Sequence, residues 1–130
     1  MNVNKAIENI IGILESNKPI DKDAVLGLLH AVEDYNVNTD ANHNGFSIGT
    51  FSYKLSKESL DGNDYFSGKY DEITKGISHY MSGISCAVNE NLVVDAGVIY
   101  NLLCMIYSYN KELGICDSNE WMLDIFKAHK

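Results

Sequence analysis

The stretch Leu92–Tyr109 reads LVVDAGVIYNLLCMIYSY, and it decides the fold expected for this chain. Coiled into a helix, it is apolar on nearly every side, which is typical of a helix in the middle of a core. Asp95 can cap this helix, because its carboxylate accepts the free backbone N–H groups of a first turn. Gly114 is placed to end the helix. The sequence therefore predicts a central buried helix that begins just after Asp95.

The same stretch approaches the length of a membrane span, which needs about 20 predominantly apolar residues. Polar side chains interrupt it at Asp95, Asn101, Ser108 and Asn110. These interruptions favour a buried core helix, and we expect no membrane partner.

Length and charge limit the other classes. A chain of 130 residues suits a single domain, here 1–130. The formal net charge is −8, and arginine is absent from the sequence. This disfavours direct binding of nucleic acid or of anionic membranes, since both are usually recognised through clustered positive charge. The acidic balance either favours a basic protein partner or serves solubility alone.

The cysteines and the N-terminus indicate the compartment. The three cysteines are widely spaced and lie in or beside apolar segments, which predicts buried, reduced thiols: Cys86, Cys104 and Cys116. The first residues, 1–10, lack the basic start and apolar block of a signal peptide. We therefore expect a cytoplasmic protein.

Apolar spacing predicts a helical hairpin at the start of the chain. The first helix covers Val3–Ser16, and Asn17–Pro19 breaks it. Asp21 caps a second helix that runs to about Tyr35. Because the connection is short, the two helices are expected to pack antiparallel.

A long helix is predicted from Asp64 to about Val88, with one apolar face. That face comprises Phe66, Tyr70, Ile73, Ile77, Met81 and Ile84. Glycines at 68, 76 and 83 share a stripe, which predicts close approach of a neighbouring helix, such as the central one.

Two shorter elements are also predicted. Asp117 can cap a last helix, and 46–55 fits either a short helix, which we favour, or a hairpin. The fold class is therefore all-α, a single-domain irregular bundle of five or six helices.

A faint internal repeat has an offset of 74 positions. Ile20-Asp21 matches Val94-Asp95, and Tyr35-Asn36 matches Tyr109-Asn110. The repeat suggests two related helical hairpins about a pseudo-twofold axis. Alternatively, two capped core helices look alike by necessity.

Motifs for chemistry are incomplete. Residues 40–45 have the first half of a calcium-loop pattern, but Phe51 stands where a bidentate glutamate should close the ion's shell. The histidines lack metal-ligand spacing, and Cys104 lies in the most apolar helix, where a thiol is usually inert. Phosphate-loop, dinucleotide and nucleophile-elbow motifs are absent from the sequence. We therefore expect no enzyme, no cofactor and no metal.

The remaining signal is a set of tyrosines among carboxylates in two clusters, which suits a protein-binding surface. The predicted partner-binding residues are Glu33, Asp34, Tyr35, Asp40, Asp61, Asp64, Tyr65, Tyr70, Asp71 and Glu72. The leading hypothesis is an acidic inhibitor or immunity-type protein that caps a basic partner, such as one that handles nucleic acid. The alternatives are a homo-oligomeric scaffold module, for which a homodimer is open, and a small enzyme or weak calcium binder.

Overall fold

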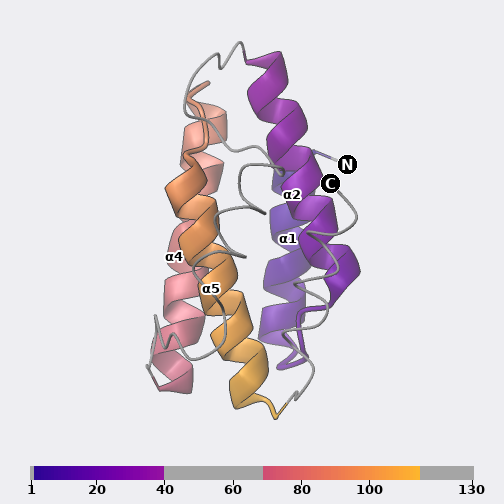
Figure 1. Cartoon of the computed structure of the whole chain (residues 1–130), viewed down its shortest axis with the longest axis vertical. Coiled ribbons are helices and arrows are strands. Elements are labelled where there is room, and N and C mark those ends of the chain that lie inside the picture. The colour runs from indigo at the N-terminus through magenta and orange to yellow at the C-terminus, as the bar shows by residue number, and fades with distance from the viewer. Residues whose placement is uncertain (1, 40–68, 115–130) are drawn as a thin grey trace, which may run out of the picture.

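The computed structural model describes residues 2–39 and 69–114, which form four helices and their connections (Figure 1). The helices are α1 (Val3–Glu15), α2 (Lys22–Asn38), α4 (Tyr70–Asn89) and α5 (Ala96–Glu112). Over these ranges the predicted all-α class is confirmed. The predicted elements at 46–55 and after Asp117 lie outside the described residues, and so does the candidate calcium loop.

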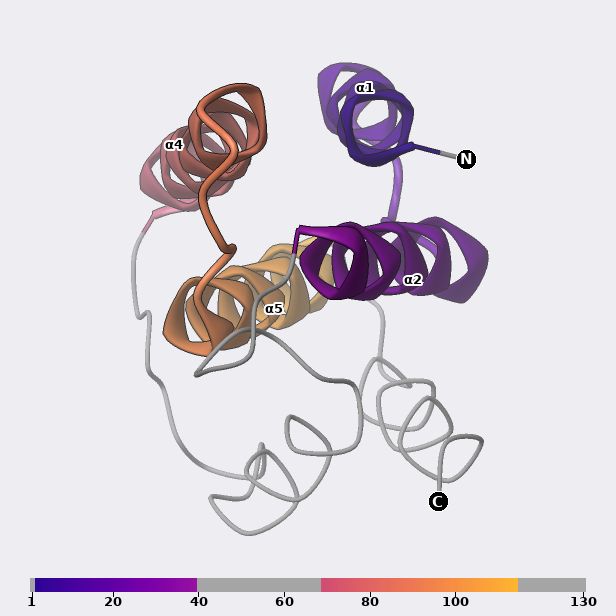
Figure 2. The same cartoon turned by 90° about the horizontal axis from the view of Figure 1, so that it is seen from above.

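The four helices form a bundle of two hairpins, α1–α2 and α4–α5. Seen from above, α1 lies beside α4 and α2 lies beside α5, with each hairpin on its own side (Figure 2). Neighbouring helices are antiparallel. The start of α1 meets the end of α4, where the Ser85 hydroxyl donates to Asn4 Oδ1 at 3.3 Å.

Helix α5 contributes more buried residues than any other described helix, which confirms the predicted buried helix. Ile99, Leu102, Ile106 and Tyr109 are fully shielded from solvent. Asp95 caps the helix through a bond from the Gly97 N–H, and Gly114 follows its end with a φ of +82°. Among the described helices, none combines the length and apolar content that crossing a membrane needs.

The first hairpin forms almost as predicted. Asp21 caps α2, and its Oδ1 accepts the Ala24 N–H at 2.8 Å. Helix α2 continues to Asn38, three residues beyond the predicted end at Tyr35. The extension is held by Thr39, whose N–H and hydroxyl both donate to the Tyr35 carbonyl, at 3.0 and 2.8 Å.

Helix α4 begins at Tyr70, so the predicted start at Asp64 is wrong. Lys69 has an extended conformation and is the N-cap residue. The Glu72 carboxylate accepts the Lys69 N–H at 3.3 Å and thereby satisfies a donor at the helix start. The predicted inward face is confirmed at Ile73, Ile77, Met81 and Ile84, which are buried, whereas Tyr70 is only partly buried and packs against the core. Phe66 lies outside the described residues.

The glycine stripe is only partly explained by close packing. At Gly76 a Cβ would overlap the Met105 side chain, so close approach of α5 is confirmed there. At Gly83 a Cβ would meet no atom within 4 Å, so the expectation is wrong at that position. Gly68 lies outside the described residues.

The cysteines show one further departure. Cys104 is buried, as predicted, whereas Cys86 is exposed on the outer side of α4. Cys116 lies outside the described residues.

The two hairpins match at the 74-residue offset that the sequence suggests. Helix α5 has the bounds of α2 shifted by 74 at both ends, and α4 ends 74 residues after α1. Asn17 and Asn91, which share this offset, have positive φ values of 54° and 58° in the two connections. Asparagine tolerates this left-handed conformation better than most residues.

Two buried asparagines join the hairpins reciprocally. The Asn36 side chain donates to the Val94 carbonyl at 3.1 Å and accepts the Val94 N–H at 3.0 Å. The Asn110 side chain makes the same two bonds with Ile20, at 3.0 and 2.9 Å. We call these contacts the asparagine–backbone pairs. They relate the hairpins about a pseudo-twofold axis, because each hairpin binds the connection of the other.

Candidate functional site

The bundle has two ends that correspond under the internal repeat. The Tyr35 end comprises the start of α1, the end of α2 and the α4–α5 connection at 90–95. The Tyr109 end comprises the start of α4, the end of α5 and the α1–α2 connection at 16–21. At each end a tyrosine hydroxyl donates to a connection of the other hairpin. Tyr35 bonds the Leu92 carbonyl at 2.9 Å, and Tyr109 bonds the Lys18 carbonyl at 2.8 Å.

The predicted site residues separate between these ends. One cluster, at the end of α2, lies at the Tyr35 end: Glu33, Asp34 and Tyr35. The other, in the first turn of α4, lies at the Tyr109 end: Tyr70, Asp71 and Glu72. Outside the described residues are Asp40, Asp61, Asp64 and Tyr65. The described members therefore form two separate surfaces.

At the Tyr109 end, the predicted residues serve the fold. The Tyr70 ring stacks on Tyr109 with a centroid distance of 5.6 Å, and its hydroxyl donates to Asn17 Oδ1 at 2.9 Å. Asp71 and Glu72 lie in the first turn of α4, where negative charge is favourable to the helix dipole. Burial raises the pKa of Tyr109, and the adjacent Tyr70 hydroxyl raises it further. Among the described residues of this end, Tyr109 is therefore fully buried, and the hydroxyls of both tyrosines have hydrogen-bond partners.

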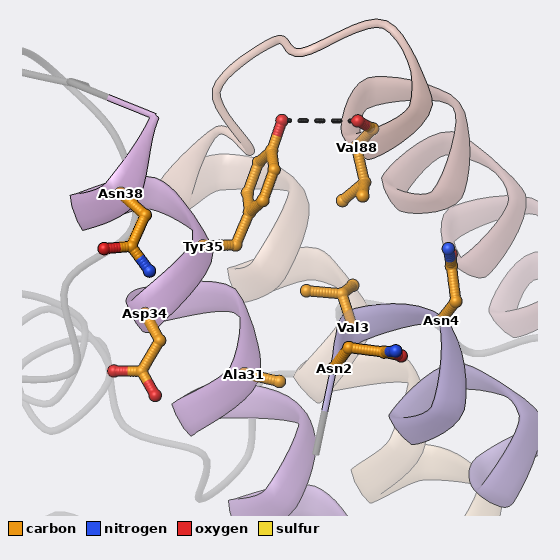
Figure 3. Close-up of a pocket in the computed structure, with 8 residues that line it drawn as sticks. All are labelled: Asn2, Val3, Asn4, Ala31, Asp34, Tyr35, Asn38 and Val88. Atoms are coloured by element: carbon orange, nitrogen blue, oxygen red, sulfur yellow. Dashed lines mark hydrogen bonds between the residues drawn. The ribbon is translucent and has the colours of Figure 1, made fainter.

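At the Tyr35 end, the tyrosine borders an open pocket of about 360 Å³ (Figure 3). The Tyr35 ring is half-buried and forms one wall, while its hydroxyl reaches over the end of α4. The full lining is Asn2, Val3, Asn4, Ala31, Asp34, Tyr35, Asn38 and Val88. The pocket thus has an apolar floor with an aromatic wall, and amides and one carboxylate line its rim.

Acidic side chains at the Tyr35 end do not stabilise the helices that carry them. Glu90 is the C-cap residue of α4, at the negative end of that helix dipole. Asp34 is exposed one turn before the end of α2, and Glu33 precedes it. Neither α2 nor α4 has a basic residue in its last turn. Helix stability therefore does not explain this acidity.

Exposed apolar side chains also lie at the Tyr35 end. Val37 is 72% exposed, Leu92 is 54% exposed and Val93 is 37% exposed, and these are the large exposed hydrophobic residues of the described chain. Their repeat equivalents at the Tyr109 end are Lys111, Lys18 and Pro19. The sequence prediction missed these three residues, because Leu92 and Val93 belong to the apolar run that was assigned to the core.

A second hollow, of about 250 Å³, lies between α4 and the start of α5. Its lining is mainly apolar, and His79, Tyr80 and Asp95 are its titratable members. Over residues 2–39 and 69–114, no three His, Cys, Asp or Glu side chains are grouped so that they could hold a metal ion. The Tyr35 end itself offers an open pocket, exposed apolar side chains and the exposed carboxylates of Asp34 and Glu90.

No protein-family model matches the chain, and the comparisons with curated proteins and with solved structures give no match either.

Proposed function

We propose that this chain is a non-enzymatic, cytoplasmic binding protein of the inhibitor or immunity type, which caps a basic protein partner through the Tyr35 end. One observation carries the proposal. The Tyr35 end combines exposed carboxylates, exposed apolar residues and an open pocket, whereas the equivalent Tyr109 end is sealed.

Charge and apolar contact have separate roles in this proposal. Carboxylates at the rim attract a basic partner and set the salt dependence of its association. The buried apolar centre of an interface supplies most of the binding free energy. Val37, Leu92 and the pocket provide that centre, and Asp34 and Glu90 provide the rim.

Affinity capture from the native host, washed at low and at high salt, tests this function. We expect a basic protein to be retained at low salt and released at high salt. The combined variant Glu33→Gln, Asp34→Asn, Glu90→Gln should weaken its retention at least tenfold, because three carboxylates of the Tyr35 end are removed.

The matched control removes three exposed carboxylates elsewhere, with Glu8→Gln, Glu15→Gln and Glu112→Gln. It changes the net charge equally and should leave capture nearly unchanged. A parallel variant, Asp71→Asn with Glu72→Gln, tests the second predicted cluster. Equal losses in the Tyr35-end variant and in the control would show that only net charge matters, and would contradict the site.

The second candidate function is a homo-oligomeric scaffold module, and the exposed Val37, Leu92 and Val93 favour it. In that case the Tyr35 ends of two copies would cover each other, and charge would be incidental. Sedimentation over a concentration series separates the two functions. A dimer that persists at high salt supports the scaffold, and a monomer at every concentration supports the basic-partner function.

A further inference from the structure

Helix α4 begins earlier than its repeat equivalent α1. The equivalent of Val3, the first residue of α1, is position 77, but α4 begins at Tyr70, seven residues sooner. The first two turns of α4 therefore have no counterpart within α1. They are the largest difference between the described parts of the two hairpins.

These two turns close the Tyr109 end. Tyr70 stacks on Tyr109, its hydroxyl binds Asn17, and Ile73 is 1% exposed beneath it. Met105 fills the remaining space against Gly76. Together they leave Tyr109 with no exposed surface.

The corresponding space at the Tyr35 end is the open pocket. Tyr35 keeps the position and hydrogen bond of Tyr109, but no ring in the described part of the chain stacks on it. Ala31 stands where Met105 stands at the other end, so less of the space is filled. Asn91, the equivalent of Asn17, is exposed and has the same positive φ.

The surface around the two tyrosines also differs, being more polar at the Tyr109 end and more apolar at the Tyr35 end. The Tyr109 end presents Lys18, Pro19 and Lys111 to solvent, and lysines are typical of a solvated surface. The equivalent positions of the Tyr35 end present Leu92, Val93 and Val37, and exposed apolar groups beside a pocket mark interaction surfaces. Covering these side chains would bury apolar area, as an interface does.

Building on the protein-binding function proposed above, we propose that the pocket beside Tyr35 receives an aromatic side chain that the basic partner carries on a helical turn. The ring takes the place that Tyr70 takes at the other end: it stacks on Tyr35, and a tyrosine hydroxyl would reach Asn91 Oδ1. An aliphatic side chain three residues later, like Ile73 after Tyr70, covers Val3 and Ala31. Asp34 at the rim pairs with a basic residue of the same turn.

The aromatic specificity can be tested on the purified full chain, without a partner. The probe is p-cresol, the side chain of tyrosine, titrated into ¹⁵N-labelled protein and followed by NMR. A fragment of this size should bind with a dissociation constant on the order of 1 mM. Amide shifts should concentrate at the start of α1, around Tyr35 and at Val88, and 4-methylcyclohexanol should bind at least about threefold more weakly, because it cannot stack.

Variants locate the binding. Ala31→Met introduces the side chain that fills the equivalent space at the Tyr109 end, and should weaken p-cresol binding at least tenfold. Asn38→Phe covers the pocket from an exposed position at the end of α2, so it gives the same loss even if Ala31→Met does not fold. The matched control, Lys111→Met, places a methionine on the Tyr109 end and should leave p-cresol binding unchanged.

Shifts that are absent up to the solubility limit, that spread over the surface, or that are equal for the two probes would overturn the aromatic docking site. So would a dimer dissociated by Asn38→Phe, since a second copy would then occupy the pocket. If p-cresol fails but a basic partner is still captured in a salt-sensitive manner, the docking site is wrong and the proposed function stands. If p-cresol binds but no basic partner is captured, the proposed function fails instead.

Discussion

The two ends of the bundle are built from equivalent residues, but the tyrosine is covered at one end and borders an open pocket at the other. Each has a tyrosine bound to the opposite connection and an asparagine paired with it. At the Tyr109 end Tyr70 covers Tyr109, and exposed Lys18 and Lys111 stand where the Tyr35 end has Leu92 and Val37, beside its open pocket. The tyrosine and asparagine contacts that both ends share are therefore the ones that the fold requires. The pocket and the exposed apolar residues occur only at the Tyr35 end, and they mark the surface that we propose for a partner.

The largest expected effect separates the two tyrosines. Tyr109→Ala should lower the free energy of unfolding by about 4 kcal/mol, because it leaves a cavity at a fully buried site and removes the stacking partner of the Tyr70 ring. Tyr35→Ala should cost only about 2 kcal/mol, since its ring is half-buried beside an open pocket. Urea denaturation followed by circular dichroism measures both values. Equal losses would mean that the two ends are equally closed in solution.

The next effect concerns the asparagine–backbone pairs, which both ends share. Asn36→Ala and Asn110→Ala should each lower the free energy of unfolding by about 3 kcal/mol, because each leaves a buried backbone N–H and carbonyl without partners. The same denaturation experiment compares them. Losses that differ by more than about a factor of two would argue against equivalent roles, since context alone accounts for a spread of that order.

The smallest expected effect is at Glu90, where one substitution should change stability and partner binding in opposite directions. Glu90→Lys should raise the free energy of unfolding by about 0.5 kcal/mol, because it replaces a negative C-cap residue of α4 by a positive one. The same change should weaken capture of the basic partner. Glu90→Gln serves as the intermediate variant. A loss of stability in Glu90→Lys would show that the carboxylate has a structural role that the present contacts do not reveal.

Local signals were sufficient to predict most of the described helices. Asp21 and Asp95 were recognised as caps because an acidic residue stood directly before an apolar periodic run. Gly114 was recognised as a stop because its position suits a left-handed residue. The start of α4 was mispredicted, because the preferred cap type at Asp64 outweighed a lysine at 69. The actual start depends on Glu72 reaching back, and on Tyr70 packing against a residue 39 positions away.

The candidate site was less accessible to sequence reasoning. Tyr35-Asn36 and Tyr109-Asn110 are identical dipeptides, so no local pattern tells which tyrosine is covered. Leu92 and Val93 continue an apolar run, and only the backbone path shows that they leave the core before α5 begins. The offset of 74 was the available signal. Comparing residues across it would have paired Val37 with Lys111 and Leu92 with Lys18.

The asparagine–backbone pairs have a consequence for how such a chain can arise. Each pair joins the last helix of one hairpin to the connection of the other, so the first hairpin by itself carries both an Asn36 donor group and an Ile20 acceptor. Two copies of that hairpin could exchange these bonds across a true twofold axis. The present chain has the form of such a homodimer fused into one polypeptide. In a single chain the two halves of this arrangement need not be identical, so Tyr70 covers Tyr109 at one end while the other end has the open pocket.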